Sequence, residues 1–408
     1  MTRGSWTATI ALLIFTMGTS IVTPLLPLYQ REFHMTDVQV TLLFSTYSAT
    51  VAGSMLLLGN VSDRHGRKAV MIPAMISISL ASLVLGFADS VPLLYLGRLL
   101  QGLAIGGFLG VGSALIVDHA HMHRRAWAAM VAGLAFRLGF GLGPGLAGVV
   151  AEHSDEPIHR PFQGHLLLMV IAFAAILATP ETISRIPRAA RAAAPRARRI
   201  QVGVPAGQFR AFALFLAPAA FLLGFLDATL LSVVPLYMVR ELGVTNLAIV
   251  GLVGFLVLGS SGFTPLLARN VPPRTAVLVG TSAGALASLL VVAASGLHAA
   301  WAVVVAAGAI GLLNGLTLQG GTTICGISVP IAERGKLMSA LYMCAYSGTV
   351  PTIGLGYLSD AIGITRALGV FTGAAVLIAL FVRFVGGRAF REVIPYTEPP
   401  AAPPASPA

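Results

Sequence analysis

The sequence carries very little charge for its length. Only 10% of its 408 residues are Asp, Glu, Lys or Arg, whereas soluble domains carry about 25%. So few charged side chains cannot cover a water-exposed surface, and a soluble globular fold is therefore excluded. Apolar residues make up 56% of the chain, and they fall in blocks of about 20, the length that crosses a hydrocarbon core of about 30 Å. We therefore predict an all-α membrane protein.

Other absences exclude further classes of protein. The two cysteines, Cys325 and Cys344, lie in or beside apolar segments, where a disulfide scaffold is implausible. The sequence has no phosphate-binding P-loop, so any pumping must draw on an ion gradient. No signal-peptide cleavage pattern precedes the first apolar block, which we expect to be retained as a helix. No nucleophile–base set stands out, so we expect neither an enzyme nor a cofactor.

Twelve apolar blocks alternate with short polar loops, and a basic, Pro-interrupted stretch divides them into six and six. We predict an N-terminal bundle (1–182), a cytoplasmic linker (183–208), a C-terminal bundle (209–388) and a disordered tail (389–408). The predicted spans are Thr7–Tyr29, Val38–Gly59, Ala69–Ala88, Pro92–Val117, Trp127–Ala151, Gln163–Thr179, Ala211–Met238, Asn246–Ala268, Thr275–Ser295, Ala299–Gly320, Leu337–Tyr357 and Thr365–Val382.

The basic residues predict the orientation of the chain. Most of the 26 fall on the side that holds both termini, and the loops of the other side hold only Arg31, Arg160, Arg240 and Arg366. Because Lys and Arg accumulate in cytoplasmic loops, both termini are expected in the cytoplasm of a multi-pass cell-membrane protein. The net charge of +11 then faces anionic membrane lipid, and nucleic acid is not needed to explain it.

The loop after the second span carries the sequence GNVSDRHGRK. It resembles a loop signature of the major facilitator superfamily, G-x-x-x-D-R-x-G-R-K/R, and it contains six matching positions: Gly59, Asp63, Arg64, Gly66, Arg67 and Lys68. Physically, glycines permit the tight turn between two helices, and an aspartate near a helix N-terminus is favoured by the helix dipole. The resemblance implies a cytoplasmic gate in which Asp63 and Arg67 act with Asp118, where the family carries a pairing acid.

The head of the fourth span reads GRLLQG. Arg98, Gln101 and Gly102 are similar to the family's R-x-x-Q-G motif. An arginine inside a membrane helix costs at least ~2.5–3.5 kcal/mol unless it faces water or a partner. Arg98 and Gln101 are therefore candidates for the cavity wall, while snorkelling of Arg98 to the interface is the alternative.

The fifth span contains a third pattern, with glycines four and five residues apart around a proline. Gly139, Gly143, Pro144 and Gly148 resemble the G-x-x-x-G-P-x-x-x-G motif of drug:proton antiporters in the same superfamily. Small residues at such spacing let helices approach closely, and the proline loosens the backbone ladder. The resemblance implies an exporter; ordinary Gly-rich packing is the alternative.

Charges within the spans are few. Of the 15 acidic residues, we place only Asp227 deep in a span, and by elimination we predict that it binds the coupled proton, because a carboxyl group out of water holds its proton more readily. A static counter-ion is the alternative. Arg137 faces either the cavity or a fixed partner on another helix. Asn314 and Tyr346 are cavity candidates for which simple helix packing remains open.

His119, His121 and His123 are two residues apart, a spacing that suits a strand better than a helix, so no metal site is predicted. We expect two six-helix bundles related by a pseudo-twofold axis, the major facilitator fold. The expected function is proton-coupled export of a small amphiphilic drug or metabolite by a monomer, with protons and lipid as its other partners. A nutrient importer or sugar exporter of this fold, or a non-transporting membrane sensor, remains the alternative.

Overall fold

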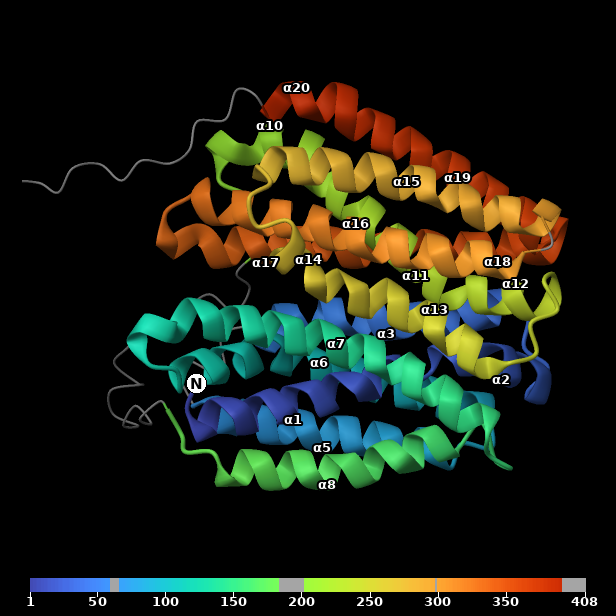
Figure 1. The fold of residues 1–408 in the computed structure, drawn as a ribbon, viewed down its shortest axis with the longest axis horizontal. Coiled ribbons are helices and arrows are strands. Elements are labelled where there is room, and N and C mark those ends of the chain that lie inside the picture. Colours follow the sequence, from blue (N-terminus) through green and yellow to red (C-terminus); the bar gives the residue numbers. More distant parts are fainter. Residues whose placement is uncertain (59–65, 183–201, 298, 391–408) are drawn as a thin grey trace, which may run out of the picture.

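A computed structural model describes residues 1–58, 66–182, 202–297 and 299–390 of the chain. The described residues form helices joined by short turns, and none of them forms a strand. The long helices lie roughly parallel, so the molecule has two ends (Figure 1). We call the end at which α1 begins and α20 ends the terminal end, and the other the opposite end.

The first half of the chain forms a bundle whose members run up and down between the two ends. Its elements are α1 (Arg3–Ser20), η1 (Thr23–Leu25), α2 (Leu26–Glu32), α3 (Asp37–Leu58), α5 (Arg67–Gly86), α6 (Val91–Asp118), η2 (Met122–Arg124), α7 (Arg125–Glu152) and α8 (Arg160–Ala178).

The second half forms a similar bundle, in which more of the helices are interrupted. Its elements are η3 (Ala206–Gln208), α10 (Phe209–Ala211), η4 (Phe212–Leu216), α11 (Ala217–Ser232), α12 (Val234–Arg240), α13 (Leu247–Ser260), η5 (Ser261–Phe263), α14 (Thr264–Leu267), α15 (Pro273–Leu297), α16 (Ala300–Ile327), α17 (Ile331–Ser347), α18 (Pro351–Ile362), α19 (Ile364–Phe381), η6 (Val382–Gly386) and α20 (Gly387–Ala389).

Ten helical segments of the described chain are long and apolar enough to cross a membrane. The two remaining predicted spans correspond to α3 and to the pair α17 and α18, which lie beside the ten in the bundles (Figure 1). Prolines account for the largest interruptions. Pro351 is the first residue of α18, and because proline lacks an N–H and fixes its backbone, the helix is broken just before it.

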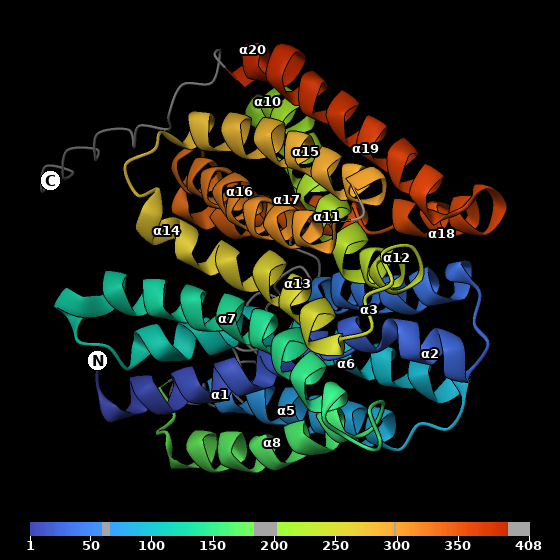
Figure 2. The same cartoon turned by 45° about the vertical axis from the view of Figure 1, so that its right-hand side comes forward.

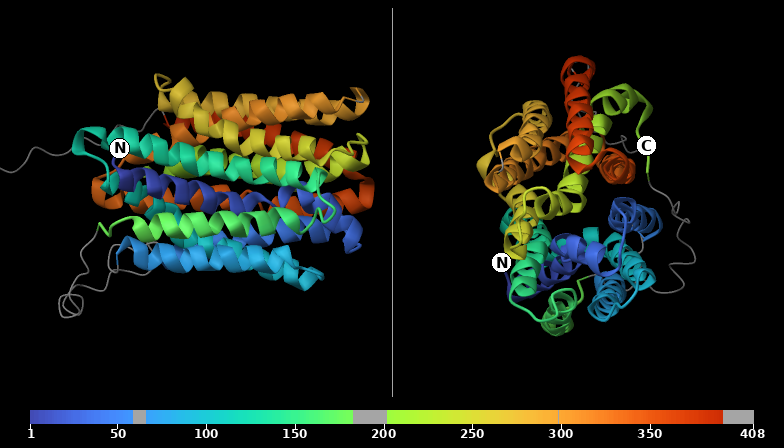
Figure 3. Two further views of the ribbon diagram at one scale, coloured as in Figure 1. Left: turned by 60° about the horizontal axis from the view of Figure 1, so that its bottom comes forward. Right: turned by 90° about the vertical axis from the view of Figure 1, so that its right-hand side faces the viewer.

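The two halves lie side by side along their whole length (Figure 1, Figure 2). An end-on view separates them into two groups of helices (Figure 3). The most extensive contacts between the groups are those of α7 with α13 and of α3 with α18. In each pair, one helix comes from the first half and the other from the second.

The buried apolar side chains form three clusters, which show where the halves are joined. The largest mixes residues of both halves near the opposite end, such as Leu25, Leu43, Val234 and Leu368. A second cluster is built on buried residues of the first half, and a third on buried residues of the second half towards the terminal end. The halves therefore share one core at the opposite end and have separate cores elsewhere.

Large apolar side chains also cover the outward faces of the bundles. Leu167 and Val170 on α8 and Leu377 on α19 are each about two-thirds exposed or more (73%, 67% and 68%). Contiguous exposed apolar faces of this kind mark contact with lipid rather than with water. The chain is therefore an all-α, multi-pass membrane protein.

Candidate functional site

A cavity of about 570 Å³ lies between the two halves. This volume is in the range of small-molecule sites. Its lining extends from the middle of the bundle towards the terminal end, because it includes Ser113 near the end of α6 and Thr322 near the end of α16. Aromatic side chains from both halves, among them Phe44, Phe136 and Tyr342, form much of the apolar wall.

Asp227 on α11 is the one acidic residue among the described residues that line this cavity. Its Oδ1 accepts a hydrogen bond of 2.6 Å from Asn314 Nδ2 on the neighbouring α16. Within the described part of the chain, no ion pair links Asp227 to a basic side chain. The carboxyl group is thus held in place by a neutral donor, and its protonation does not require a fixed salt bridge to break.

Arg137 on α7 lines the same cavity from the first half. Its Nη1 donates a hydrogen bond of 3.2 Å to Ser261 Oγ on η5 of the second half. The side chain is half-buried, and guanidinium has five N–H donors. Arg137 therefore bridges the halves at the level of the cavity.

Arg98 is also at the cavity wall, but its guanidinium is enclosed, with 1% of the residue exposed. It donates hydrogen bonds to Gln101 Oε1 and to three backbone carbonyl oxygens. Those carbonyls belong to Thr19 on α1 and to Leu43 and Phe44 on α3. Arg98 therefore ties α6 to two neighbouring helices, and it does not snorkel to a membrane interface.

Two of the cavity candidates lie behind the wall. Gln101 is fully buried, and its Nε2 donates a 2.6 Å hydrogen bond to the Gly18 carbonyl oxygen. Asn314 is 2% exposed and reaches the site only through Asp227. Tyr346 lines the cavity directly. Residue type and position along the chain do not tell which of these side chains face the cavity and which lie behind its wall. The rotation of each helix about its axis determines this.

The glycines of the fifth-span motif, now in α7, allow contact with two different helices. A Cβ added at Gly139 or Gly143 would overlap α1, at Leu13 O and Met17 O respectively. A Cβ added at Gly148 would stand 2.9 Å from Gly251 Cα on α13 of the other half. The motif therefore packs α7 against its own bundle at one level and against the second half at another.

A polar cluster occupies the terminal end of the first half. Arg67 Nε is 3.3 Å from Asp118 Oδ2, and Thr182 Oγ1 also donates to that oxygen. Glu181 accepts hydrogen bonds from the backbone N–H groups of Arg67 and Lys68 and so caps α5. The predicted pairing of Arg67 with Asp118 is present, whereas Gly59, Asp63 and Arg64 of the predicted gate lie outside the described residues.

Gly66 precedes α5 with φ of +95°, a backbone conformation that favours glycine. Lys68 Nζ donates to the Leu177 carbonyl oxygen on α8.

His121 and His123 stack on each other at the start of the fifth span, and no group of three metal-ligating side chains occurs in the described ranges.

Two helix bundles with a cavity between them agree with the result of a family comparison. Residues 8–353 match the model of the Major Facilitator Superfamily. The chain belongs to this superfamily. Its members are transporters rather than enzymes.

Two curated relatives match part of the chain. The class B tetracycline resistance protein of Escherichia coli is 32% identical over 175 residues, which is 42% of this chain and 42% of that protein. The multidrug resistance protein MdtL of Salmonella paratyphi A is 29% identical over 174 residues, 43% of this chain and 40% of that protein. Each match thus spans less than half of the relative's length.

Among solved structures, a mutant of the peptide transporter POT in complex with alafosfalin superposes with a TM-score of 0.79. The match covers 95% of both chains at 14% sequence identity. Similarity at this level of sequence identity establishes the fold alone.

Proposed function

We propose that this protein is a proton-coupled exporter of small amphiphilic compounds in the cell membrane. The observation that carries the proposal is Asp227, a carboxyl group in the cavity wall that is bound by Asn314 and has no ion pair among the described residues. Such a group can take up a proton from one side and release it to the other. The names of the two partial relatives, a tetracycline resistance protein and a multidrug resistance protein, support drug-like molecules as substrates.

The cavity wall suits an amphiphilic substrate. Aromatic rings and small apolar residues supply area for burial, while Arg137, Tyr346 and Thr322 supply hydrogen-bonding groups. Pockets of this composition bind drug-sized ligands chiefly through apolar surface and use a few polar groups for orientation. Because the carboxyl group of Asp227 and the guanidinium of Arg137 line the same cavity, substrate and proton can compete for the same space.

The gradient available to one proton is sufficient for export. Entry down about 100 mV releases ~2.3 kcal/mol, and one unit of pH difference adds ~1.4 kcal/mol. Together these could hold a neutral substrate at a gradient of roughly 500-fold for each proton.

In the proposed orientation the arginine-rich terminal end is cytoplasmic, so the cavity in this structure extends towards the cytoplasm and the halves are joined on the outer side.

Inverted membrane vesicles test the proposal. With an inside-acid pH gradient imposed, vesicles that contain the protein should accumulate ethidium or tetracycline, and collapse of the gradient should release it. Vesicles from the same host without the protein are the control. Uptake by right-side-out vesicles would instead indicate an importer, and no gradient-dependent movement of any probe in either orientation would exclude proton-coupled transport of these compounds.

A further inference from the structure

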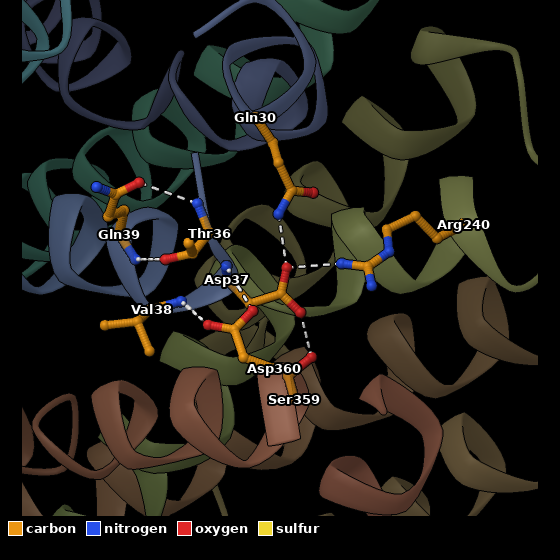
Figure 4. Close-up of polar contacts among 8 residues, drawn as sticks. All are labelled: Gln30, Thr36, Asp37, Val38, Gln39, Arg240, Ser359 and Asp360. Carbon is orange, nitrogen blue, oxygen red and sulfur yellow. Dashed lines mark hydrogen bonds and ion pairs between the residues drawn. The ribbon is translucent and has the colours of Figure 1, made fainter. Parts of the chain in front are cut away.

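A buried carboxylate lies at the junction of the halves at the opposite end. Asp37, the first residue of α3, has a side chain that is only 4% exposed. Its Oδ1 accepts hydrogen bonds of 2.6 Å from Gln30 Nε2 of its own half and from Arg240 Nη1 of the second half. Its Oδ2 accepts from Ser359 Oγ on α18 (Figure 4). One carboxylate thus binds side chains from both halves.

The neighbouring Asp360 makes a contact of a different kind. Its carboxylate accepts hydrogen bonds from the backbone N–H groups of Asp37 (3.0 Å) and Val38 (3.2 Å) (Figure 4). These are the first N–H groups of α3, which have no acceptor within the helix, and the positive end of the helix dipole favours an anion there. A carboxylate of the second half therefore caps a helix of the first.

The same arrangement occurs in reverse at the other helix pair. Glu152, the last residue of α7 in the first half, accepts a 2.6 Å hydrogen bond from the backbone N–H of Leu247. Leu247 is the first residue of α13 in the second half. The two contacts are reciprocal, since each half supplies one carboxylate and one helix N-terminus.

Neither helix needs the other half for its own capping. At the start of α3, Thr36 Oγ1 accepts from the Gln39 N–H, and Gln39 Oε1 accepts from the Thr36 N–H, as in a capping box. At the start of α13, Asn246 Oδ1 accepts from the N–H groups of Ala248 and Ile249. The carboxylates from the opposite half therefore add a link between the bundles, and both helices stay capped without it.

The sequence repeats a pattern at this place. Residues 356–363 read G-x-x-S-D-x-x-G, and residues 59–66 in the loop signature read the same. The last glycine of each pattern has positive φ and directly precedes a helix, Gly66 (φ 95°) before α5 and Gly363 (φ 87°) before α19. The first pattern ends at the terminal end, and the second contains the capping Asp360 at the opposite end.

The first glycine of the second pattern also has a steric role. A Cβ at Gly356 would stand 2.9 Å from both the Asp37 carbonyl oxygen and Val38 Cα. Glycine therefore lets α18 lie directly against the backbone of α3, so that the Asp360 carboxylate reaches the N–H groups.

We propose that Asp360 and Glu152, together with the ion pair of Asp37 with Arg240, form a latch that holds the opposite end closed. It must release each time the cavity opens to that side, and its strength sets the balance between the two states of the transporter. These are positioning residues, which act through the arrangement of the halves. In the orientation proposed above, the opposite end is the outer end. The latch is inferred from contacts between the halves and does not depend on that orientation.

Distances between spin labels test the latch without any substrate. In purified full-length protein with Cys325→Ala and Cys344→Ala, one pair of cysteine labels replaces exposed Arg31 and Glu241 across the opposite end. A second pair replaces exposed His121 and Arg269 across the terminal end. Asp360→Asn keeps the size of the side chain and removes its charge. We expect it to raise the ratio of open to closed populations at the opposite end by about 5- to 150-fold.

Matched variants separate the latch from general damage. Glu152→Gln tests the reciprocal contact and should shift the distances in the same direction, and the double variant should shift them further. Asp155→Asn removes an exposed carboxylate from the loop after α7, and its distances should match those of the parent.

Should Asp360→Asn fold poorly, Glu152→Gln carries the test alone, since it lies at the other contact. Unchanged distances at the opposite end in both single variants would overturn the latch. Because no transport is measured, that failure is distinct from failure of the export proposal.

Discussion

Replacement of Gly148 by alanine should force the halves apart at the opposite end. The added Cβ would stand 2.9 Å from Gly251 Cα and nearer still to the Leu247 carbonyl oxygen, whereas ordinary contact begins at 3.4 Å. Both neighbours are backbone atoms of α13, so no side-chain rotation relieves the overlap. The two helices must separate locally by about 0.5 Å or more, the difference between these distances.

The magnitude follows from the cost of overpacking, which is typically ~1–3 kcal/mol. The gain of about 1 kcal/mol in helix propensity of alanine over glycine applies to α7 in both states and cancels from their ratio. If the overlap exists only when the opposite end is closed, the ratio of open to closed populations should rise by about 5- to 150-fold. The spin-label pairs described above measure this ratio.

Two further glycines act as controls for Gly148→Ala. Gly143→Ala overlaps Met17 and Ser20 of α1 in its own half, so it should lower the temperature of unfolding and leave the population ratio unchanged. Gly164→Ala on α8 meets nothing within 4 Å, so it should leave the population ratio unchanged and should not lower the temperature of unfolding, because alanine favours the helix over glycine. If Gly148→Ala lowers stability but leaves the ratio of states at its parent value, then α7 and α13 stay in contact in both states and our reasoning is wrong.

Three other predictions concern orientation, the terminal-end cluster and the buried arginine. A cysteine at Asp155 should react with an impermeant thiol reagent added to intact cells and one at His121 should not; the reverse pattern would overturn the orientation. Asp118→Asn removes one ion-pair partner of Arg67, a loss of ~1–3 kcal/mol in a partly buried pair, and should slow transport with normal membrane insertion; an unchanged rate would count against the gate. The lysine of Arg98→Lys cannot reach acceptors on two helices at once. The variant should therefore lower the free energy of unfolding in detergent by at least ~1.5–3 kcal/mol, the value of one charged hydrogen bond. An unaltered melting temperature would refute the role of Arg98 in tying the three helices together.

Much of the fold could be predicted from the sequence because hydrophobic length is a local property. Each predicted span overlaps a helical segment of the structure, and the loop motif predicted the pairing of Arg67 with Asp118. The breaks within helices were harder to place. A proline stands at the interruption between α17 and α18, Pro351, yet Pro144 lies inside the continuous α7. The proline alone therefore does not say which helix is broken.

The site was only partly predictable, since helix rotation and contacts between distant segments determine it. The sequence singles out Asp227 because it stands alone in an apolar span, whereas Asp37, just before the predicted span Val38–Gly59, carries no such signal. Its partners Arg240 and Ser359 lie 203 and 322 positions away in the sequence. The repeated G-x-x-S-D-x-x-G pattern at residues 59–66 and 356–363 is a signal in the sequence that could have directed attention to this end of the molecule.

In the proposed mechanism, Asp227 couples the movement of the proton to that of the substrate. In proteoliposomes with an imposed pH gradient, Asp227→Asn keeps the size of the side chain and its bond to Asn314 but fixes a neutral group. The variant should lose uphill, gradient-driven accumulation of ethidium or tetracycline and retain downhill exchange of the same probe. Uphill accumulation by Asp227→Asn at the wild-type level would contradict the account and would require another proton site.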